Sequence, residues 1–132
     1  MEKVGMPHIV NSRCVLAVRN LEASTTYFVN ALGFQKDPVD AAGWSFLTRD
    51  TFREILGECP DVVLAHELGD HSYFAYWNVD AVDEFYQELV GRGAIVSSAP
   101  TDKPWGLREF GLKTADGHRI TCGQVIRTQT TR

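Results

Sequence analysis

Two halves of the 132-residue chain repeat the same order of predicted elements at a spacing of about 60 residues. Aligning Leu21 with Val82 also brings Phe28 onto Leu89 and Val29 onto Val90, so two predicted helices carry matching apolar positions. A repeat of this length is typical of a duplicated supersecondary unit. Each copy can bury one helix face against one sheet face, and two copies then pair as halves of one structure. We therefore expect an α+β fold whose free sheet faces curve around a shared cavity.

The pattern of apolar and turn residues predicts strand, helix and three strands in each half. In the first half the predicted strands are 9–18, 34–36, 44–49 and 52–57, and the helix runs from an Asn20 N-cap to Gly33. In the second half the predicted strands are 72–79, 94–98, 107–113 and 118–123, with a helix over 81–90 capped by Asp80. Ala115, Asp116 and Gly117 form the predicted hairpin corner between the last two strands.

Size and composition favour one folding unit. A chain of 132 residues with 44% hydrophobic residues can fill one core but is short for two ordinary domains. We expect a single domain over residues 9–124, with module one at about 9–57, module two at about 72–124, and tails at 1–8 and 125–132. The N-terminus lacks the apolar core of a signal peptide and no apolar run is long enough for a membrane span, so we expect a cytoplasmic protein without a membrane partner.

The charges and cysteines narrow the class of partner. The formal net charge is −4 and the basic residues are scattered singly, which argues against nucleic-acid binding and favours a small neutral or cationic ligand. Cys14, Cys59 and Cys122 are an odd number at wide spacings, so the sequence indicates neither a disulfide framework nor a zinc knuckle.

Two segments carry a family resemblance: LAVRNLEASTTYFVNALGF at 16–34 and KTADGHRITCGQ at 113–124. With the order of elements, they resemble the vicinal oxygen chelate superfamily, which includes glyoxalase I, the bleomycin-resistance proteins, fosfomycin-resistance enzymes and extradiol dioxygenases. The similarity is greatest to the bleomycin-resistance-like members. It implies paired βαβββ modules that form an open, cavity-enclosing barrel, often completed by a second chain in a homodimer.

The resemblance also implies where a divalent metal would be held. The positions of two histidines and one glutamate in the family fall here on Arg13, Phe74 and Thr121. A guanidinium and a benzyl ring offer no lone pair to a metal, so we expect no metal site and no cofactor. The alternative is a displaced divalent-metal site in which Glu54 acts with His66 or His71, which would make the protein a lyase, isomerase or oxygenase.

The residues expected to contact a ligand are rings and polar groups near the predicted cavity. Trp105 is the first candidate because it lies beside Gly106 at the barrel mouth. A pair of Arg13 with Glu109 could bind an anionic ligand group, although Arg13 could instead form an internal salt bridge or turn outward. The complete predicted ligand-binding set is Trp105, Arg13, Glu109, Thr121, Trp44 and Phe74.

Three functions remain open from the sequence. The first is a binding or sequestering protein that has lost the family's metal ligands. The second is an enzyme with a glyoxalase-like lyase or dioxygenase-related activity, either through the displaced metal or through Glu109 as a general base. The third is an interaction module whose barrel is filled by its own side chains. Arg108 and Glu109 lie on opposite faces of one predicted strand, so only one of the two charges can line the cavity.

Overall fold

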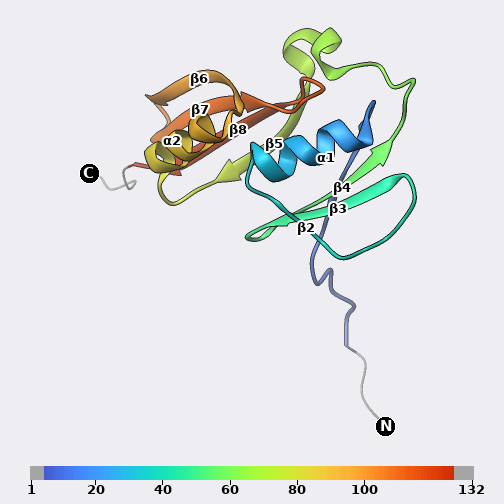
Figure 1. The fold of residues 1–132 in the computed structure, drawn as a ribbon. Helices are drawn as coiled ribbons and strands as arrows, with labels where there is room; N and C mark the ends of the chain where they lie inside the picture. The colour runs from blue at the N-terminus through green and yellow to red at the C-terminus, as the bar shows by residue number, and fades with distance from the viewer. Residues whose placement is uncertain (1–4, 127–132) are drawn as a thin grey trace.

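The computed structural model describes residues 5–126 as two four-stranded sheets, each accompanied by a helix (Figure 1). The first module consists of β1 (Cys14–Val18), α1 (Leu21–Asn30), β2 (Gln35–Lys36), β3 (Trp44–Arg49) and β4 (Phe52–Glu58). The second consists of β5 (Tyr73–Asn78), α2 (Val82–Arg92), β6 (Ile95–Asp102), β7 (Leu107–Lys113) and β8 (Arg119–Val125). A short 3-10 segment, η1 (Ala65–His71), lies in the connection between them. Within these residues no helix is long and apolar enough to cross a membrane.

The two sheets have the same topology. Their strand orders are β1-β4-β3-β2 and β5-β8-β7-β6. In each sheet the strand that comes first in the chain pairs in parallel with the one that comes last, β1 with β4 and β5 with β8, and the remaining pairs are antiparallel. The predicted α+β class and the duplicated βαβββ order are thereby confirmed. The sheets curve, but within one chain they do not close into a barrel.

The first strand is shorter than the pattern predicts. Residues 9–18 were expected to form it, but only Cys14–Val18 pair, beginning with Cys14 opposite Glu54. β4 begins at Phe52 and is the neighbour of β1 in the sheet, so the chain before Cys14 has little strand to pair with. Ile9 and Val10 are consequently 91% and 87% exposed.

The two helices begin differently. The prediction of Asn20 as the N-cap of α1 is confirmed, because its Oδ1 accepts a hydrogen bond of 3.0 Å from the Ala23 N–H. The prediction of Asp80 as the cap of α2 is wrong. There the side chain of Gln124, on β8, accepts from the Val82 N–H at 2.9 Å, so a residue distant in sequence satisfies the first helical donor.

The buried core joins the modules through the faces that carry the helices. Tyr27 of α1 donates its hydroxyl to the Lys113 carbonyl at 2.6 Å and accepts from the Ile95 N–H at 2.9 Å, which ties α1 to the second sheet. The largest side chains enclosed there are Phe28, Leu32, Leu47, Leu56, Leu89, Phe110, Leu112 and Ile120. Because these faces pack together, the opposite face of each sheet is left uncovered by the chain. We call these the open faces.

Arg49 makes the main polar link between the modules. Its Nη1 and Nη2 atoms donate to the two carboxylate oxygens of Glu88 on α2 at 3.0 and 2.9 Å, and Nη1 also donates to the Leu32 carbonyl at 2.8 Å. Its guanidinium lies 4.8 Å from the ring centroid of Phe85. The hydrogen bond from Arg49 lowers the pKa of Glu88, so this two-point ion pair persists at neutral pH.

Candidate functional site

The open face of the second sheet carries the polar groups of the candidate site. Strand alternation puts Phe110, Leu112 and Cys122 in the core and turns Glu109, Gly111 and Thr121 to the opposite side. A shallow cradle of about 200 Å³ lies over this face. Its polar lining consists of Ser97, Ser98, Thr101, Lys103, Glu109, Arg119 and Thr121.

Glu109 is held by two ring donors. The Tyr76 hydroxyl donates to Oε2 at 2.7 Å, and the Trp105 indole N–H reaches the same oxygen at 3.2 Å. Within residues 5–126 the other oxygen, Oε1, accepts no hydrogen bond and is available to a ligand. Burial, followed by the hydrogen bond to Glu109, raises the pKa of Tyr76 to about 12, so the phenol stays a donor at neutral pH.

Gly123 allows this arrangement. Tyr76 on β5 reaches Glu109 on β7 by crossing β8, and a Cβ atom at position 123 would clash with the tyrosine hydroxyl. Only glycine leaves room for the ring to cross the strand so closely. The role of Tyr76 was missed from the sequence, where it was one of several rings, because the crossing depends on the pairing of β5 with the distant strand β8.

The hydrogen-bond partners of Arg108 and Glu109 show which of the two side chains lies on the open face. Arg108 donates to Asp83 of α2 at 2.9 Å and to Asp102 at 2.8 Å, so it lies on the side of the helix. Glu109 therefore supplies the charge on the open face.

The open face of the first sheet is more apolar and carries the cations Arg13 and Arg53. Trp44 and Val15 are 47% and 63% exposed on it, and the Trp44 ring lies against Gly57. The Arg13 guanidinium is 5.7 Å from the Phe46 ring centroid and 3.8 Å from a carboxylate oxygen of Asp37. Arg13 therefore forms an ion pair with Asp37, which agrees with the alternative that this residue makes a salt bridge within the chain.

The structure brings the predicted ligand-binding residues together in two groups. Trp105, Glu109 and Thr121 lie on or beside the open face of the second sheet, and Arg13 and Trp44 belong to that of the first. Among the described residues no hydrogen bond, ion pair or ring contact joins the groups, so the expected Arg13–Glu109 pair is not formed within one chain.

Phe74 belongs to neither group. It lies at a register shift in β5, and its ring contacts Phe52 and His118 at centroid distances of 6.2 and 6.0 Å. It is packed against the core cluster, away from the open face that carries Thr121.

A known protein family has a sequence model that matches most of this chain. The family model described as "Glyoxalase/Bleomycin resistance protein/Dioxygenase superfamily" matches residues 5–121. The chain belongs to this superfamily. No curated protein sequence matches it significantly.

Several solved structures share its fold. The bleomycin resistance determinant encoded on transposon Tn5 aligns with a TM-score of 0.72 at 21% identity, covering 88% of this chain and 98% of that one. TnmS3, an antibiotic binding protein from Streptomyces sp. CB03234, aligns with a TM-score of 0.66 at 20% identity, covering 89% and 99%. TioX from Micromonospora sp. ML1 gives 0.66 at 19% identity, covering 91% and 99%.

The resemblance puts Arg13, Phe74 and Thr121 at the superfamily's metal-ligand positions, and these side chains do not fit a divalent metal. A guanidinium at Arg13 and a benzyl ring at Phe74 have no donor electron pair for the ion, and the Thr121 hydroxyl is a poor replacement for a carboxylate. Nor is the displaced set assembled, because residues 5–126 contain no group of three or more His, Cys, Asp or Glu side chains that could hold an ion. His66 instead lies on η1 against Gly117.

Glu54, the carboxylate of that displaced set, lies on the core side of β4. It is fully buried, and within residues 5–126 neither carboxylate oxygen has a hydrogen-bond partner. Burial raises its pKa from 4.5 to about 8. Its strand neighbours Arg53 and Ile55 take the open face, so alternation alone turns this carboxylate away from a ligand.

Proposed function

We propose that the protein binds a small organic molecule of the antibiotic class and sequesters it without a metal ion. The observation that carries this proposal is the Tyr76–Glu109–Trp105 arrangement, a fixed carboxylate with one free oxygen on a face that the chain leaves uncovered. A carboxylate positioned by two ring donors is prepared to bind a ligand group rather than to stabilise the fold. The antibiotic-binding and bleomycin-resistance proteins with the same architecture support this reading.

The binding cavity in this proposal lies between two chains. Each open face carries exposed rings, Trp44 on the first sheet and Trp105 beside the second, and exposed apolar residues such as Val15 and Val125. Exposed apolar groups of this size on a sheet face are typical of an interaction surface. In a homodimer, the first-sheet face of one protomer covers the second-sheet face of its partner and completes the cavity.

The side chains then define the ligand. A flat part of the molecule lies between Trp44 of one protomer and Trp105 of its partner. A hydrogen-bond donor, most favourably a charged one, meets the free oxygen of Glu109, and hydroxyl or carbonyl groups meet the serine and threonine hydroxyls of the cradle. We therefore expect a polar molecule with a planar portion.

A titration tests the proposal. Bleomycin is expected to bind saturably with two sites per dimer when followed by calorimetry, and native mass spectrometry should show intact ligand on the protein. Ni²⁺, Mn²⁺, Fe²⁺ and Zn²⁺ are expected to give no stoichiometric binding, because the ligand positions hold Arg13, Phe74 and Thr121.

Two results would contradict the proposal. One is tight binding of one metal equivalent per chain. The other is absence of saturable bleomycin binding together with absence of any organic molecule that co-purifies with the protein.

A further inference from the structure

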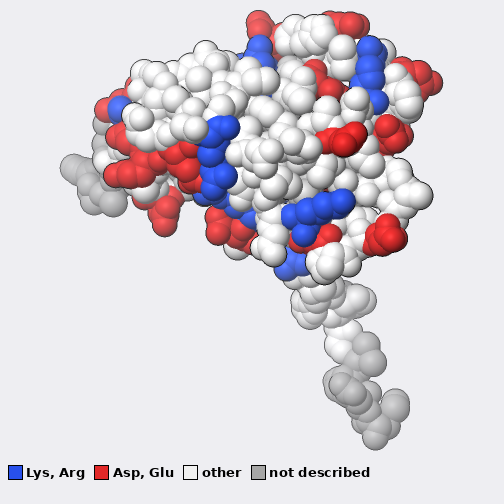
Figure 2. Space-filling model, viewed as in Figure 1, with Lys and Arg blue, Asp and Glu red and all other residues white. Residues whose placement is uncertain are grey.

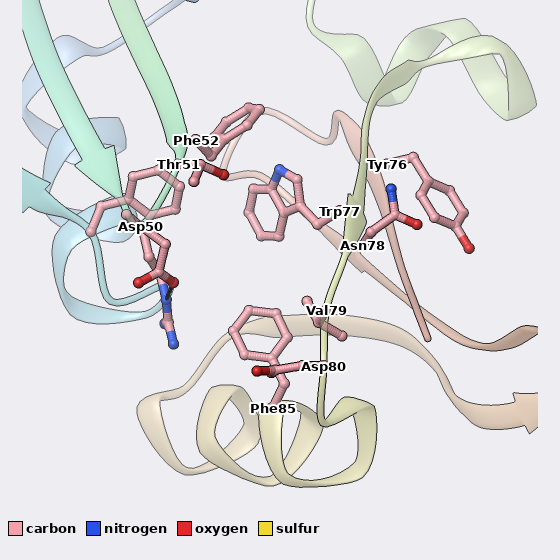
Figure 3. A pocket seen from close by; sticks show the side chains of 11 residues that line it. Asp50, Thr51, Phe52, Tyr76, Trp77, Asn78, Val79, Asp80 and Phe85 are labelled. Carbon is pink, nitrogen blue, oxygen red and sulfur yellow. Dashed lines mark ion pairs between the residues drawn. The ribbon is translucent and has the colours of Figure 1, made fainter. Parts of the chain in front are cut away.

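A second cavity lies where the two modules meet, and it borders the second open face only at Tyr76 and Asn78. This inter-module cleft has a volume of about 590 Å³ and is bordered on one side by the Asp50-Thr51 turn between β3 and β4. On the other side lie the end of β5, Asp80 and the first turns of α2 (Figure 3). Its size is in the range of cavities that hold small organic molecules.

Aromatic rings form the wall of the cleft. Trp77 points from β5 towards Phe52, with Phe85 on its other side, while Tyr76 and Asn78 point away across the strand (Figure 3). The ring centroids of Trp77 lie 5.3 Å from Phe52, 5.8 Å from Phe34 and 6.4 Å from Phe85. Trp77 is only 9% exposed and Phe34 is buried, so the half-buried rings of Phe52 and Phe85 supply the surface against which another flat ring can pack.

The charges at the cleft are predominantly negative. Asp50 and Asp80 are both exposed at its rim. A carboxylate oxygen of Asp50 lies 3.6 Å from the Nε atom of Arg49, whereas within residues 5–126 the Asp80 carboxylate has no hydrogen-bond or ion-pair partner. Acidic side chains also gather over the region of α2, whose first turn holds Asp83 and Glu84 (Figure 2).

The single cation of the cleft is already neutralised. Arg49 lines it, but its guanidinium is engaged by both carboxylate oxygens of Glu88, by the Leu32 carbonyl and, at 3.6 Å, by the Asp50 carboxylate. An anionic ligand would therefore meet two carboxylates and a compensated arginine. A cationic ligand would meet the unpaired Asp80 carboxylate, the Asp50 carboxylate and those ring faces that Arg49, which lies over the Phe85 ring, does not cover.

We propose that the inter-module cleft is a second ligand site that takes a flat organic cation, an aromatic ring carrying an ammonium or amidinium group. The ring packs against Phe52 and Phe85, beside the exposed edge of Trp77, and the cationic group lies between Asp50 and Asp80. Of the residues proposed for the open-face site, Tyr76 also borders this cleft, but Trp105, Glu109 and Thr121 do not line it.

A matched pair of probes tests which sign of ligand charge the cleft prefers. 2-Naphthylmethylammonium and 2-naphthoate carry the same ring with opposite charges. In calorimetry at low salt, the ammonium compound is expected to bind one site per chain at least ten-fold more tightly than the carboxylate, and added salt should reduce the difference. Equal affinities, or no saturable binding of the ammonium compound, would overturn the proposal.

Paired variants test the location. Asp50→Asn with Asp80→Asn should weaken binding of the ammonium compound about ten-fold. Asp50 has a positive φ of 54°, which asparagine adopts readily, so the substitution keeps the turn. The control, Asp61→Asn with Glu67→Gln, removes two exposed acids outside the cleft and should leave the affinity unchanged. Equal weakening in both double variants would mean that only net charge matters, and would refute the site.

Amide and indole NMR signals separate the two sites. Binding of the ammonium compound should shift the Trp77 indole signal, identified with Trp77→Phe, and leave the Thr121 amide unchanged. Trp105→Ala should not alter this binding, so failure here is distinct from failure of the open-face proposal. Shifts at Thr121 without shifts at Trp77 would place the cation on the open face and overturn the inference.

Discussion

Replacing Glu54 by leucine is expected to raise the free energy of unfolding by about 4 kcal/mol at pH 8. Glu54 is fully buried without a hydrogen-bond partner among the described residues, and its pKa is about 8 in the fold. Unfolding restores the usual value of 4.5, and each pKa unit is worth about 1.4 kcal/mol. Leucine removes this ionisation and leaves no buried polar group unpaired. Urea unfolding of both proteins across pH measures the difference.

The sign of the change in stability with pH follows from the raised pKa of Glu54. The fold holds the proton of Glu54 more tightly than the unfolded chain does, so its contribution to stability is complete below about pH 4.5 and is lost as the pH rises through about 8. The advantage of the leucine variant should therefore shrink towards pH 5. Glu54→Gln is the matched control, since it keeps a polar side chain and should also remove this pH dependence. A stability profile that all three proteins share would show that Glu54 is not buried as described.

Replacing Trp105 by alanine is expected to weaken bleomycin binding about 30-fold, or about 2 kcal/mol. The ring is 60% exposed in one chain and donates to Glu109, so its loss removes both a stacking surface and one of the two donors that position this carboxylate. The same exposure means that the free energy of unfolding should change by less than about 0.5 kcal/mol. Calorimetry with bleomycin measures the affinity.

The control for Trp105 is Leu68→Ala, which removes a 50% exposed apolar side chain from η1, away from both open faces. It should leave bleomycin affinity unchanged. If the Trp105 variant binds as tightly as the unaltered protein, the ring has no part in ligand binding and the open-face site is wrong.

Periodicity predicted most of the fold because each module is locally determined. The helix positions from Leu21 and Val82 and the Asp116-Gly117 corner depend on residues close together in the chain. Alternation along β7 also predicted that Arg108 and Glu109 lie on opposite faces of the sheet. Only the contact of Arg108 with Asp83 shows that Arg108 is on the helix side and Glu109 on the open face.

The remaining features depend on contacts between distant segments. Gln124 replaces Asp80 as the partner of the α2 N-terminus because β8 passes beside it, which no local pattern shows. The irregular pairing of β5 places Phe74 against Phe52, and the sequence gives no sign of such an irregularity. The inter-module cleft exists only because the Asp50 turn and the Asp80 connection meet when the modules pack.

In the proposed dimer one ligand site combines the open faces of two protomers, and heterodimers of two variants distinguish this arrangement from a site within one chain. Trp44→Ala damages the first-sheet face and Trp105→Ala the second-sheet face. Co-expressed with different tags and purified in tandem, the two variants should give a heterodimer with one intact site and one doubly damaged site. Calorimetry should then find one bleomycin bound per heterodimer at the unaltered affinity, and only weak binding in either homodimer. Weak binding in the heterodimer as well would show that each site lies within a single chain.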